Sequence, residues 1–198
     1  MSDSPRTAVR SPYWGVPTAR AIPFVITALI VTFSSNHSAQ LGLLSYGLFA
    51  IVTGVIVGVL SWRTITERSV RILFLVQGIV SVALGVLALG FNTGGLGFLL
   101  FCATMNAAIA GFLELYAGLR TTKNPASRDW IVVGGLTVVF ALVLIFFPTD
   151  PVFVVGMFGA YCAIVGLFLL IAGLSLRWGT QESLTSRAAP APRSGKAS

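Results

Sequence analysis

The chain has 198 residues, of which 56% are hydrophobic and 10% charged, and thirteen Lys and Arg against six Asp and Glu give a formal net charge of +7. Soluble domains are about one-quarter charged, and a mean hydropathy of +0.90 lies far above their level. The composition excludes a soluble enzyme, a nucleic-acid-binding module and a secreted disulfide scaffold. It predicts an integral membrane protein whose main surroundings are the lipid bilayer.

The N-terminal part of the chain contains a polar tail and the weakest predicted span. The first twenty residues hold no apolar run long enough for a cleavable signal peptide. Residues 1–15 are predicted to be disordered. The first span is predicted at about 16–34. Its continuous apolar core runs only from Ala21 to Phe33 and contains Pro23. A re-entrant or interfacial segment is therefore the alternative for this element.

Five further apolar stretches are each long enough to cross a hydrocarbon core, which needs about 17 to 25 helical residues. They are predicted at about 41–62, 72–91, 96–119, 131–147 and 152–176. Residues 178–198 are rich in Ala, Pro and Ser and are predicted to be a second disordered tail. The predicted fold is thus an all-α integral membrane domain over 16–177, with six transmembrane helices.

Charge placement predicts the orientation of the spans. With six spans, all thirteen Lys and Arg fall on one side, and cytoplasmic loops are the ones that collect these residues. Both termini are therefore expected in the cytoplasm, and the short outer connections are expected to pair the helices as three hairpins. The four tryptophans each lie at a cytoplasmic end of a span, as in an aromatic belt: Trp14, Trp62, Trp130 and Trp178.

Spaced small residues predict close helix packing. The segments Arg71–Arg120 and Arg128–Arg177 are equally long, each encloses a hairpin, and Gly78 aligns with Gly135 in this repeat. Small residues four apart allow helices to approach closely, and the same faces could serve self-association. The candidate packing residues are Gly54, Gly58, Gly111, Gly118, Gly166 and Gly173.

The last hairpin resembles the HdeD-type acid-resistance membrane protein family of bacteria. The resemblance rests on residues 134–177, GGLTVVFALVLIFFPTDPVFVVGMFGAYCAIVGLFLLIAGLSLR, where a Gly-rich helix ends in the step Phe147-Pro148. The next helix carries the spaced glycines Gly159, Gly166 and Gly173 and closes on Arg177. The resemblance implies a bacterial inner-membrane protein linked to acid stress, and it supplies no catalytic residues.

Glu114 is predicted to be the one ionisable side chain well inside a span. It shares a helix face with several alanines, so it is expected to point into protein. Gln77 lies at a similar depth and is a candidate hydrogen-bond partner, while Asn106 is a further polar neighbour whose face is offset by about 80°. This candidate intramembrane polar site is either a structural clamp or a proton or ligand site.

The remaining reactive side chains do not assemble into a catalytic or metal site. His37 is the only histidine and lies in the first outer connection, where it is either inert or a sensor of external acid. Cys102 and Cys162 lie within spans and are expected to be reduced packing residues. No nucleophile–base set or metal-ligand cluster is apparent, so neither an enzyme nor a cofactor is expected.

Two functions remain open. The first is a non-catalytic multi-pass membrane protein of the HdeD type, which acts in stress tolerance through membrane integrity or by binding a membrane-protein partner or a second copy of itself. The alternative is a small transporter or channel that uses the polar site around Glu114. The outer halves of the spans carry few polar groups, which favours the first.

Overall fold

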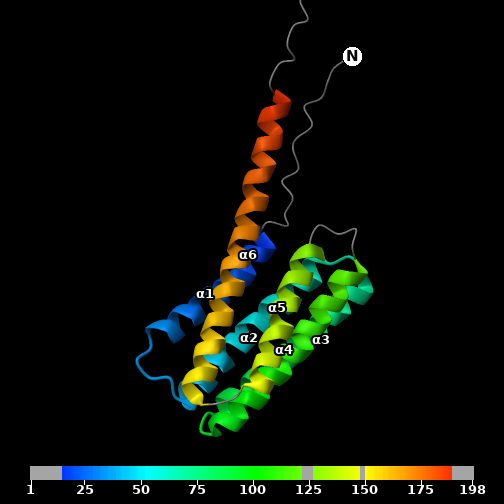
Figure 1. Ribbon diagram of the computed structural model, residues 1–198. Helices are drawn as coiled ribbons and strands as arrows, with labels where there is room; N and C mark the ends of the chain where they lie inside the picture. The colour runs from blue at the N-terminus through cyan, green and yellow to red at the C-terminus, as the bar shows by residue number, and fades with distance from the viewer. Residues whose placement is uncertain (1–14, 122–126, 148–149, 189–198) are drawn as a thin grey trace, which may run out of the picture.

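The computed structural model of the chain describes residues 15–121, 127–147 and 150–188, without the side chains of residues 176–188. These residues form six α-helices and no strand (Figure 1): α1 (Gly15–Phe33), α2 (Ala39–Thr64), α3 (Arg68–Gly90), α4 (Gly95–Arg120), α5 (Ser127–Phe146) and α6 (Pro151–Ala188). Each helix contains a stretch long and apolar enough to cross a membrane. The predicted all-α, six-span fold is confirmed.

The first predicted span is a continuous helix. α1 has 19 residues with Pro23 inside it, which at about 1.5 Å per residue gives a length of about 28 Å. That length is close to the thickness of a hydrocarbon core. α1 is therefore a sixth helix capable of crossing the membrane rather than a short re-entrant segment.

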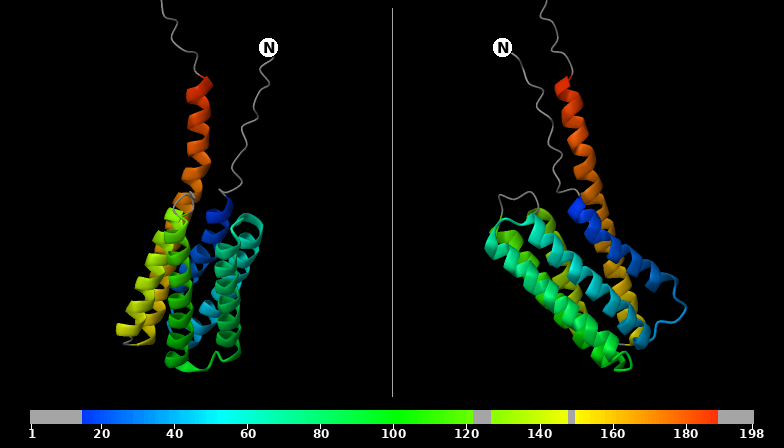
Figure 2. Two further views of the ribbon diagram at one scale, coloured as in Figure 1. Left: turned by 90° about the vertical axis from the view of Figure 1, so that its right-hand side faces the viewer. Right: turned by 180° about the vertical axis from the view of Figure 1, so that it is seen from behind.

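The two ends of the helical chain lie at the same end of the bundle. α1 begins there and α6 leaves it, and the chain passes from α2 to α3 and from α4 to α5 at that end (Figures 1 and 2). We call it the termini end. α1 ends and α2 begins at the opposite end of the bundle, as do α3 and α4 and then α5 and α6, and we call it the turn end (Figure 1).

The closest helix pairs are not those that the outer connections join. α2 packs most closely with α3, α4 with α5, and α1 with α6, whereas α1–α2, α3–α4 and α5–α6 are in looser contact. Figure 2 shows α1 beside α6. The short outer turns are present, but they do not define the tight hairpins that the sequence predicted. The reason is that glycines, not connection lengths, set how closely two helices approach.

Glycines lie where α2 meets α3. A β-carbon at Gly54 would lie 2.7 Å from the carbonyl oxygen of Gly78, and one at Gly47 would lie 3.0 Å from that of Gly85. Gly58 is different from Gly54. A β-carbon added at Gly58 would meet nothing within 4 Å. The backbone of Gly58 is nevertheless close to α3, because a β-carbon added at Gly78 would lie 3.3 Å from the Gly58 nitrogen. The predicted packing residue Gly58 therefore lies at the contact through its backbone, but a side chain added there would face open space.

Glycines also lie at the contacts of the other two close pairs, α4–α5 and α1–α6. A β-carbon at Gly111 would lie 2.9 Å from Val138 N, and one at Gly118 would lie 3.0 Å from Ile131 N. On α6, a β-carbon at Gly166 would lie 3.2 Å from Phe24 Cβ, and one at Gly173 would touch Thr18. The packing roles predicted for these four glycines are confirmed.

The repeat alignment is wrong by one residue in α5. A β-carbon at Gly134 would lie 2.6 Å from Leu115 N, whereas one at Gly135 would meet nothing within 4 Å. Gly134 is therefore the counterpart of Gly78, because it is the glycine turned toward the paired helix.

α6 continues well beyond the membrane-spanning stretch. It reaches Ala188 and projects past the other helices at the termini end (Figure 1). The prediction of a disordered tail is therefore wrong for residues 178–188. This segment contains no proline, and Pro190 follows shortly after Ala188, where helices commonly end. The predicted tails at 1–14 and 189–198 lie outside the described residues.

One of the predicted belt tryptophans belongs to the interior. Trp62 is exposed, and Arg71 lies over its ring at 4.9 Å, as an interfacial residue would be. Trp130 is 5% exposed and packs on Phe74 with the ring centroids 5.0 Å apart. Its assignment to the belt is wrong, because α5 turns this face toward α3 rather than outward. Trp14 and the side chain of Trp178 lie outside the described residues.

The apolar core runs along the facing sides of the helices and contains both cysteines. Cys102 and Cys162 are free and 0% exposed. Each packs in the main cluster of buried aliphatic and aromatic side chains. Their role as packing residues is confirmed.

Candidate functional site

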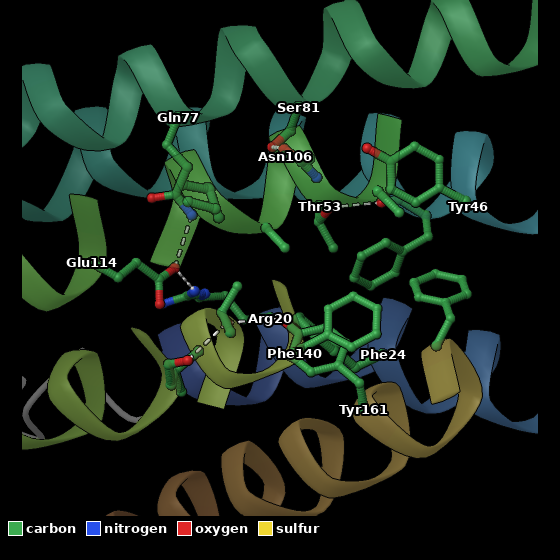
Figure 3. A pocket seen from close by; sticks show the side chains of 18 of the residues that line it. Arg20, Phe24, Tyr46, Thr53, Gln77, Ser81, Asn106, Glu114, Phe140 and Tyr161 are labelled. Atoms are coloured by element: carbon green, nitrogen blue, oxygen red, sulfur yellow. Dashed lines mark hydrogen bonds and ion pairs between the residues drawn. The ribbon is translucent and has the colours of Figure 1, made fainter. Parts of the chain in front are cut away.

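A cavity lies at the centre of the bundle and is lined by side chains from all six helices (Figure 3). The empty space between its atoms amounts to about 640 Å³, including the part that opens to the surroundings. The part of this space that water can enter is much smaller, and it is room for a few water molecules. The lining residues are Arg20, Phe24, Tyr46, Phe49, Thr53, Ile56, Val57, Gln77, Ser81, Ala103, Asn106, Ala107, Ala110, Glu114, Val133, Thr137, Phe140, Phe158 and Tyr161.

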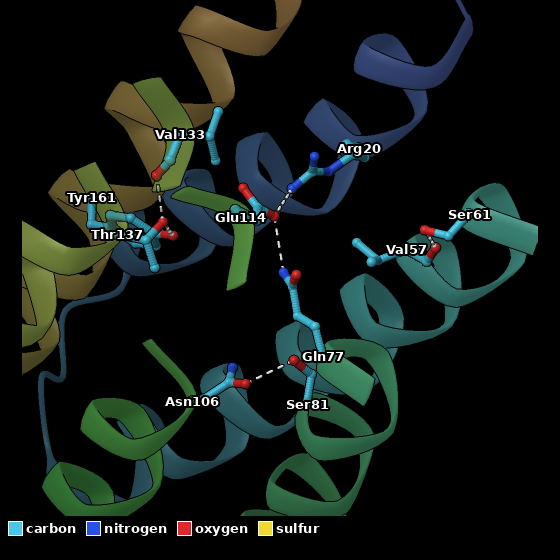
Figure 4. A network of polar contacts seen from close by, with 10 residues as sticks. All are labelled: Arg20, Val57, Ser61, Gln77, Ser81, Asn106, Glu114, Val133, Thr137 and Tyr161. Atoms are coloured by element: carbon cyan, nitrogen blue, oxygen red, sulfur yellow. Dashed lines mark hydrogen bonds and ion pairs between the residues drawn. The ribbon is translucent and has the colours of Figure 1, made fainter. Parts of the chain in front are cut away.

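Glu114 is the centre of a three-residue polar cluster on one side of this cavity. Arg20 Nη2 forms an ion pair and hydrogen bond with Glu114 Oε1, and Gln77 Nε2 donates to the same oxygen over 2.9 Å (Figure 4). The exposed fractions are 9% for Arg20, 6% for Gln77 and 2% for Glu114. The hydrogen bond predicted between Gln77 and Glu114 is therefore present, within a larger cluster that joins α1, α3 and α4.

Arg20 is the functional residue that sequence reasoning missed. It was counted with the cations that set the topology, although it falls inside the predicted span 16–34. A carboxylate buried in a membrane span needs a positive partner or several hydrogen bonds. Arg20 lies about as far into its span as Glu114 and Gln77 lie into theirs, so matching depths could have identified the pair.

Asn106 lines the same cavity but has a different partner. Ser81 Oγ donates to Asn106 Oδ1 over 2.7 Å, which forms a second link between α3 and α4. Gln77 and Ser81 are four residues apart on one face of α3, so the two links are stacked along that helix. The structure thus brings all three predicted site residues to one cavity, with Asn106 in the neighbouring link rather than on Glu114.

The other side of the cavity is aromatic. Phe24 meets Phe49 edge-on with the centroids 4.8 Å apart, and Phe140 stacks on Tyr161 at 4.4 Å. Tyr46 donates its hydroxyl to the carbonyl oxygen of Cys102 over 2.9 Å. Edge-on and stacked ring pairs of this kind attract one another and stabilise the wall. The cavity therefore has one polar wall and one aromatic wall.

Hydroxyl groups of the aromatic wall are satisfied within the protein. Thr137 donates to the carbonyl oxygen of Val133 over 2.7 Å, so the Tyr161 hydroxyl donates to Thr137 Oγ1, 2.8 Å away. The polar cluster differs from this wall. Arg20 Nε, Gln77 Oε1 and Glu114 Oε2 are buried and have no hydrogen-bond partner. Each such atom costs about 1–3 kcal/mol if it stays unpaired.

A second, smaller cavity adjoins the first toward the termini end. Both are lined by Arg20 and Val57, so these two side chains separate them. The other residues of the smaller cavity are Val16, Leu60, Ser61, Thr64, Ile65, Phe74 and Trp130. Arg20 therefore occupies the boundary between the central cavity and a cavity nearer to one end of the bundle.

Other candidate residues lie away from this site. His37 is half-buried in the connection at the turn end. Within the described parts of the chain, no group of three or more His, Cys, Asp and Glu side chains is placed to hold a metal ion. The chemistry that the cavity offers is therefore hydrogen bonding, one ion pair and contact with aromatic rings.

Comparison with protein-family models, with curated proteins and with solved structures finds no match for this chain.

Proposed function

We propose that this chain is a small transporter or channel that holds a small molecule in the central cavity of its six-helix bundle. One observation carries the proposal: the polar wall of the cavity keeps three buried polar atoms without a partner, on Arg20, Gln77 and Glu114. A purely structural clamp is expected to satisfy its own polar atoms, because native proteins leave few of them unpaired. Movement of these three side chains toward the cavity would let a bound molecule or water supply the missing partners.

The ion pair supports the same proposal. Charged groups are costly inside a membrane, and those that occur there face the bundle interior and mark ligand or ion pathways. Arg20 and Glu114 contact one another on one wall of a cavity rather than within a packed interface. The pair therefore fits a binding or transport role better than a packing role.

The position of Arg20 suggests the route. Since Arg20 and Val57 separate the central cavity from the smaller one, opening of the Arg20–Glu114 pair would join the two spaces. A small molecule would then exchange with the water at the termini end. The many Lys and Arg at that end support its assignment to the cytoplasm, with both termini inside. A bacterial inner membrane follows from the resemblance to the HdeD-type family.

Cysteine labelling tests whether the cavity is accessible. Ala107 lines the cavity and is 6% exposed, while Ala117 lies on the same helix, is 0% exposed and does not line it. Ala107→Cys and Ala117→Cys are made on a background in which both native cysteines are alanine. We expect methyl methanethiosulfonate to modify Ala107→Cys at least about tenfold faster, because only this thiol reaches water that can take up its proton. Equal rates would contradict the proposal.

The second candidate is a non-catalytic HdeD-type role in stress tolerance, through membrane integrity or partner binding. It is favoured by the helices themselves, which are unbroken over their described lengths and pack in close pairs at glycines. Many secondary transporters bind their substrate between broken helices. Equal labelling of the two cysteine variants would favour this candidate, since the bundle would then be closed.

A further inference from the structure

The outer side of the α2–α3 contact carries two arginines that can bind an anion. Arg68 and Arg71 lie in the first turn of α3, at the termini end of the bundle. Within the described part of the chain, their guanidinium groups form no ion pair or hydrogen bond. Arg63 in the last turn of α2 adds a third cation, and Glu67 is the one acidic residue of this connection. Three cations against one carboxylate leave the connection with a net positive charge.

The ring of Trp62 positions one of these arginines. The Arg71 guanidinium lies over the exposed Trp62 ring, with its carbon 4.9 Å from the ring centroid. Contact with a ring uses the face of a guanidinium and leaves the N–H groups at its edge, where a phosphate can accept two of them. Tryptophan at the end of a membrane span lies at the depth of the lipid headgroups. The Trp62–Arg71 pair therefore holds a phosphate-binding group at that depth.

The same side of the contact has open space for an acyl chain, one helical turn deeper in the membrane. Gly58 precedes Trp62 by four residues, and a β-carbon added to it would meet nothing within 4 Å. Exposed apolar side chains flank this space on both helices, Val55 on α2 and Ile79 on α3. Val55 shares a helix face with Trp62, and Ile79 shares one with Arg68. An apolar surface thus continues from the arginines toward the middle of the membrane.

We propose that this surface binds an anionic phospholipid whose headgroup carries a phosphodiester and no cation. The phosphate accepts hydrogen bonds from Arg68 and Arg71, and one acyl chain lies over Gly58 between Val55 and Ile79. A zwitterionic lipid would bring its own ammonium group next to the arginines, and like charges repel. These five residues do not line the central cavity, so the inference is independent of the proposed function.

Native mass spectrometry of the full chain tests the proposal, because it resolves each bound lipid by its mass. The protein in mild detergent is titrated with dioleoyl phosphatidylglycerol or with dioleoyl phosphatidylcholine, which carry the same acyl chains. We expect the first phosphatidylglycerol to bind at least about tenfold more tightly, since each of the two arginines contributes about fivefold near the membrane surface. Equal dissociation constants for the two lipids would overturn the proposal.

Two arginine variants separate a site from general attraction to a cationic protein. Arg71→Gln should weaken phosphatidylglycerol binding about fivefold. Arg120→Gln on α4 is the matched control, since it removes the same charge at the same end of the bundle from a guanidinium that is already bonded to Tyr116. It should weaken binding less than about twofold, because it acts only through screened charge. Equal weakening in the two variants would show that net charge alone attracts the lipid, which overturns the site.

A matched pair of glycines tests the position of the acyl chain. Gly58→Leu fills the open space beside α3 and should weaken binding of both lipids at least about threefold, because the displaced chain loses its contacts with the protein. Gly135→Leu makes the same change on α5, where an added β-carbon also meets nothing within 4 Å, and should leave both dissociation constants unchanged. Equal effects of the two variants would overturn the placement of the chain. The comparison of the two lipids on the wild type decides the anionic preference even where a variant does not fold.

Discussion

The interfaces within the helix pairs are tightly packed, whereas the space between the pairs is loosely packed and polar. Within the α2–α3 and α4–α5 pairs, glycine backbones touch so closely that a single β-carbon would collide with the facing helix. Between the pairs lie the cavity, the ion pair and three polar atoms without partners. The close packing of these helices is therefore concentrated in the pairs, and the polar groups lie where the packing is loose.

The largest loss of stability is expected at the Arg20–Glu114 ion pair, in the space between the helix pairs. Arg20→Leu leaves the Glu114 carboxylate buried without its cation, which should lower the free energy of unfolding by about 3–5 kcal/mol. The measurement is unfolding by SDS in mixed micelles. The control is the double variant Arg20→Leu/Glu114→Leu, which should be more stable than the single variant because no lone charge remains. A double variant less stable than Arg20→Leu would contradict the buried ion pair.

The next largest loss of stability is expected at the close contact between α2 and α3. Gly54→Ala places a methyl group 2.7 Å from a backbone oxygen of α3, which cannot move aside as a side chain could. We expect a loss of about 1–3 kcal/mol in the same unfolding assay. Gly58→Ala, one helical turn away, adds its methyl group to open space and should be neutral or slightly stabilising, because alanine favours helix. Equal losses in the two variants would show that α2 and α3 do not meet at this register.

A smaller effect is expected for one hydroxyl at the aromatic wall. Tyr46→Phe removes the hydrogen bond to the carbonyl oxygen of Cys102 and should cost about 0.5–1.5 kcal/mol. Tyr116→Phe is the control, since the Tyr116 hydroxyl is bonded to Arg120 at an exposed position and its loss should change stability little. In melting curves, Tyr46→Phe should unfold at a lower temperature than Tyr116→Phe. The reverse order would argue against the contact between α2 and α4.

Hydropathy and charge were sufficient to predict the six helices, because a membrane requires long apolar helices and cations on one side. The Gln77–Glu114 bond followed from the similar depth of the two residues in their spans. Helix pairing could not be predicted from the lengths of the outer turns, since it depends on which glycine faces a neighbour, as Gly134 does and Gly135 does not. Arg20 was assigned to topology because its charge fits that role, although its depth in the span matches that of Glu114 and Gln77.

α1 packs against α6 and so brings Arg20 to Glu114 at the centre of the bundle. The most direct test is the cysteine pair Thr18→Cys/Gly173→Cys in native membranes, with the native cysteines replaced by alanine. A β-carbon at Gly173 would lie 3.5 Å from Thr18 Cβ, within the range of about 3.5–4.5 Å that disulfides require.

The readout is the gel shift caused by a polyethylene glycol maleimide after mild oxidation. We expect the double variant to lose both reactive thiols, while each single variant keeps its own and both double-variant thiols return on reduction. Two thiols that stay reactive after oxidation would contradict the α1–α6 pair and, with it, the placement of Arg20 in the cavity.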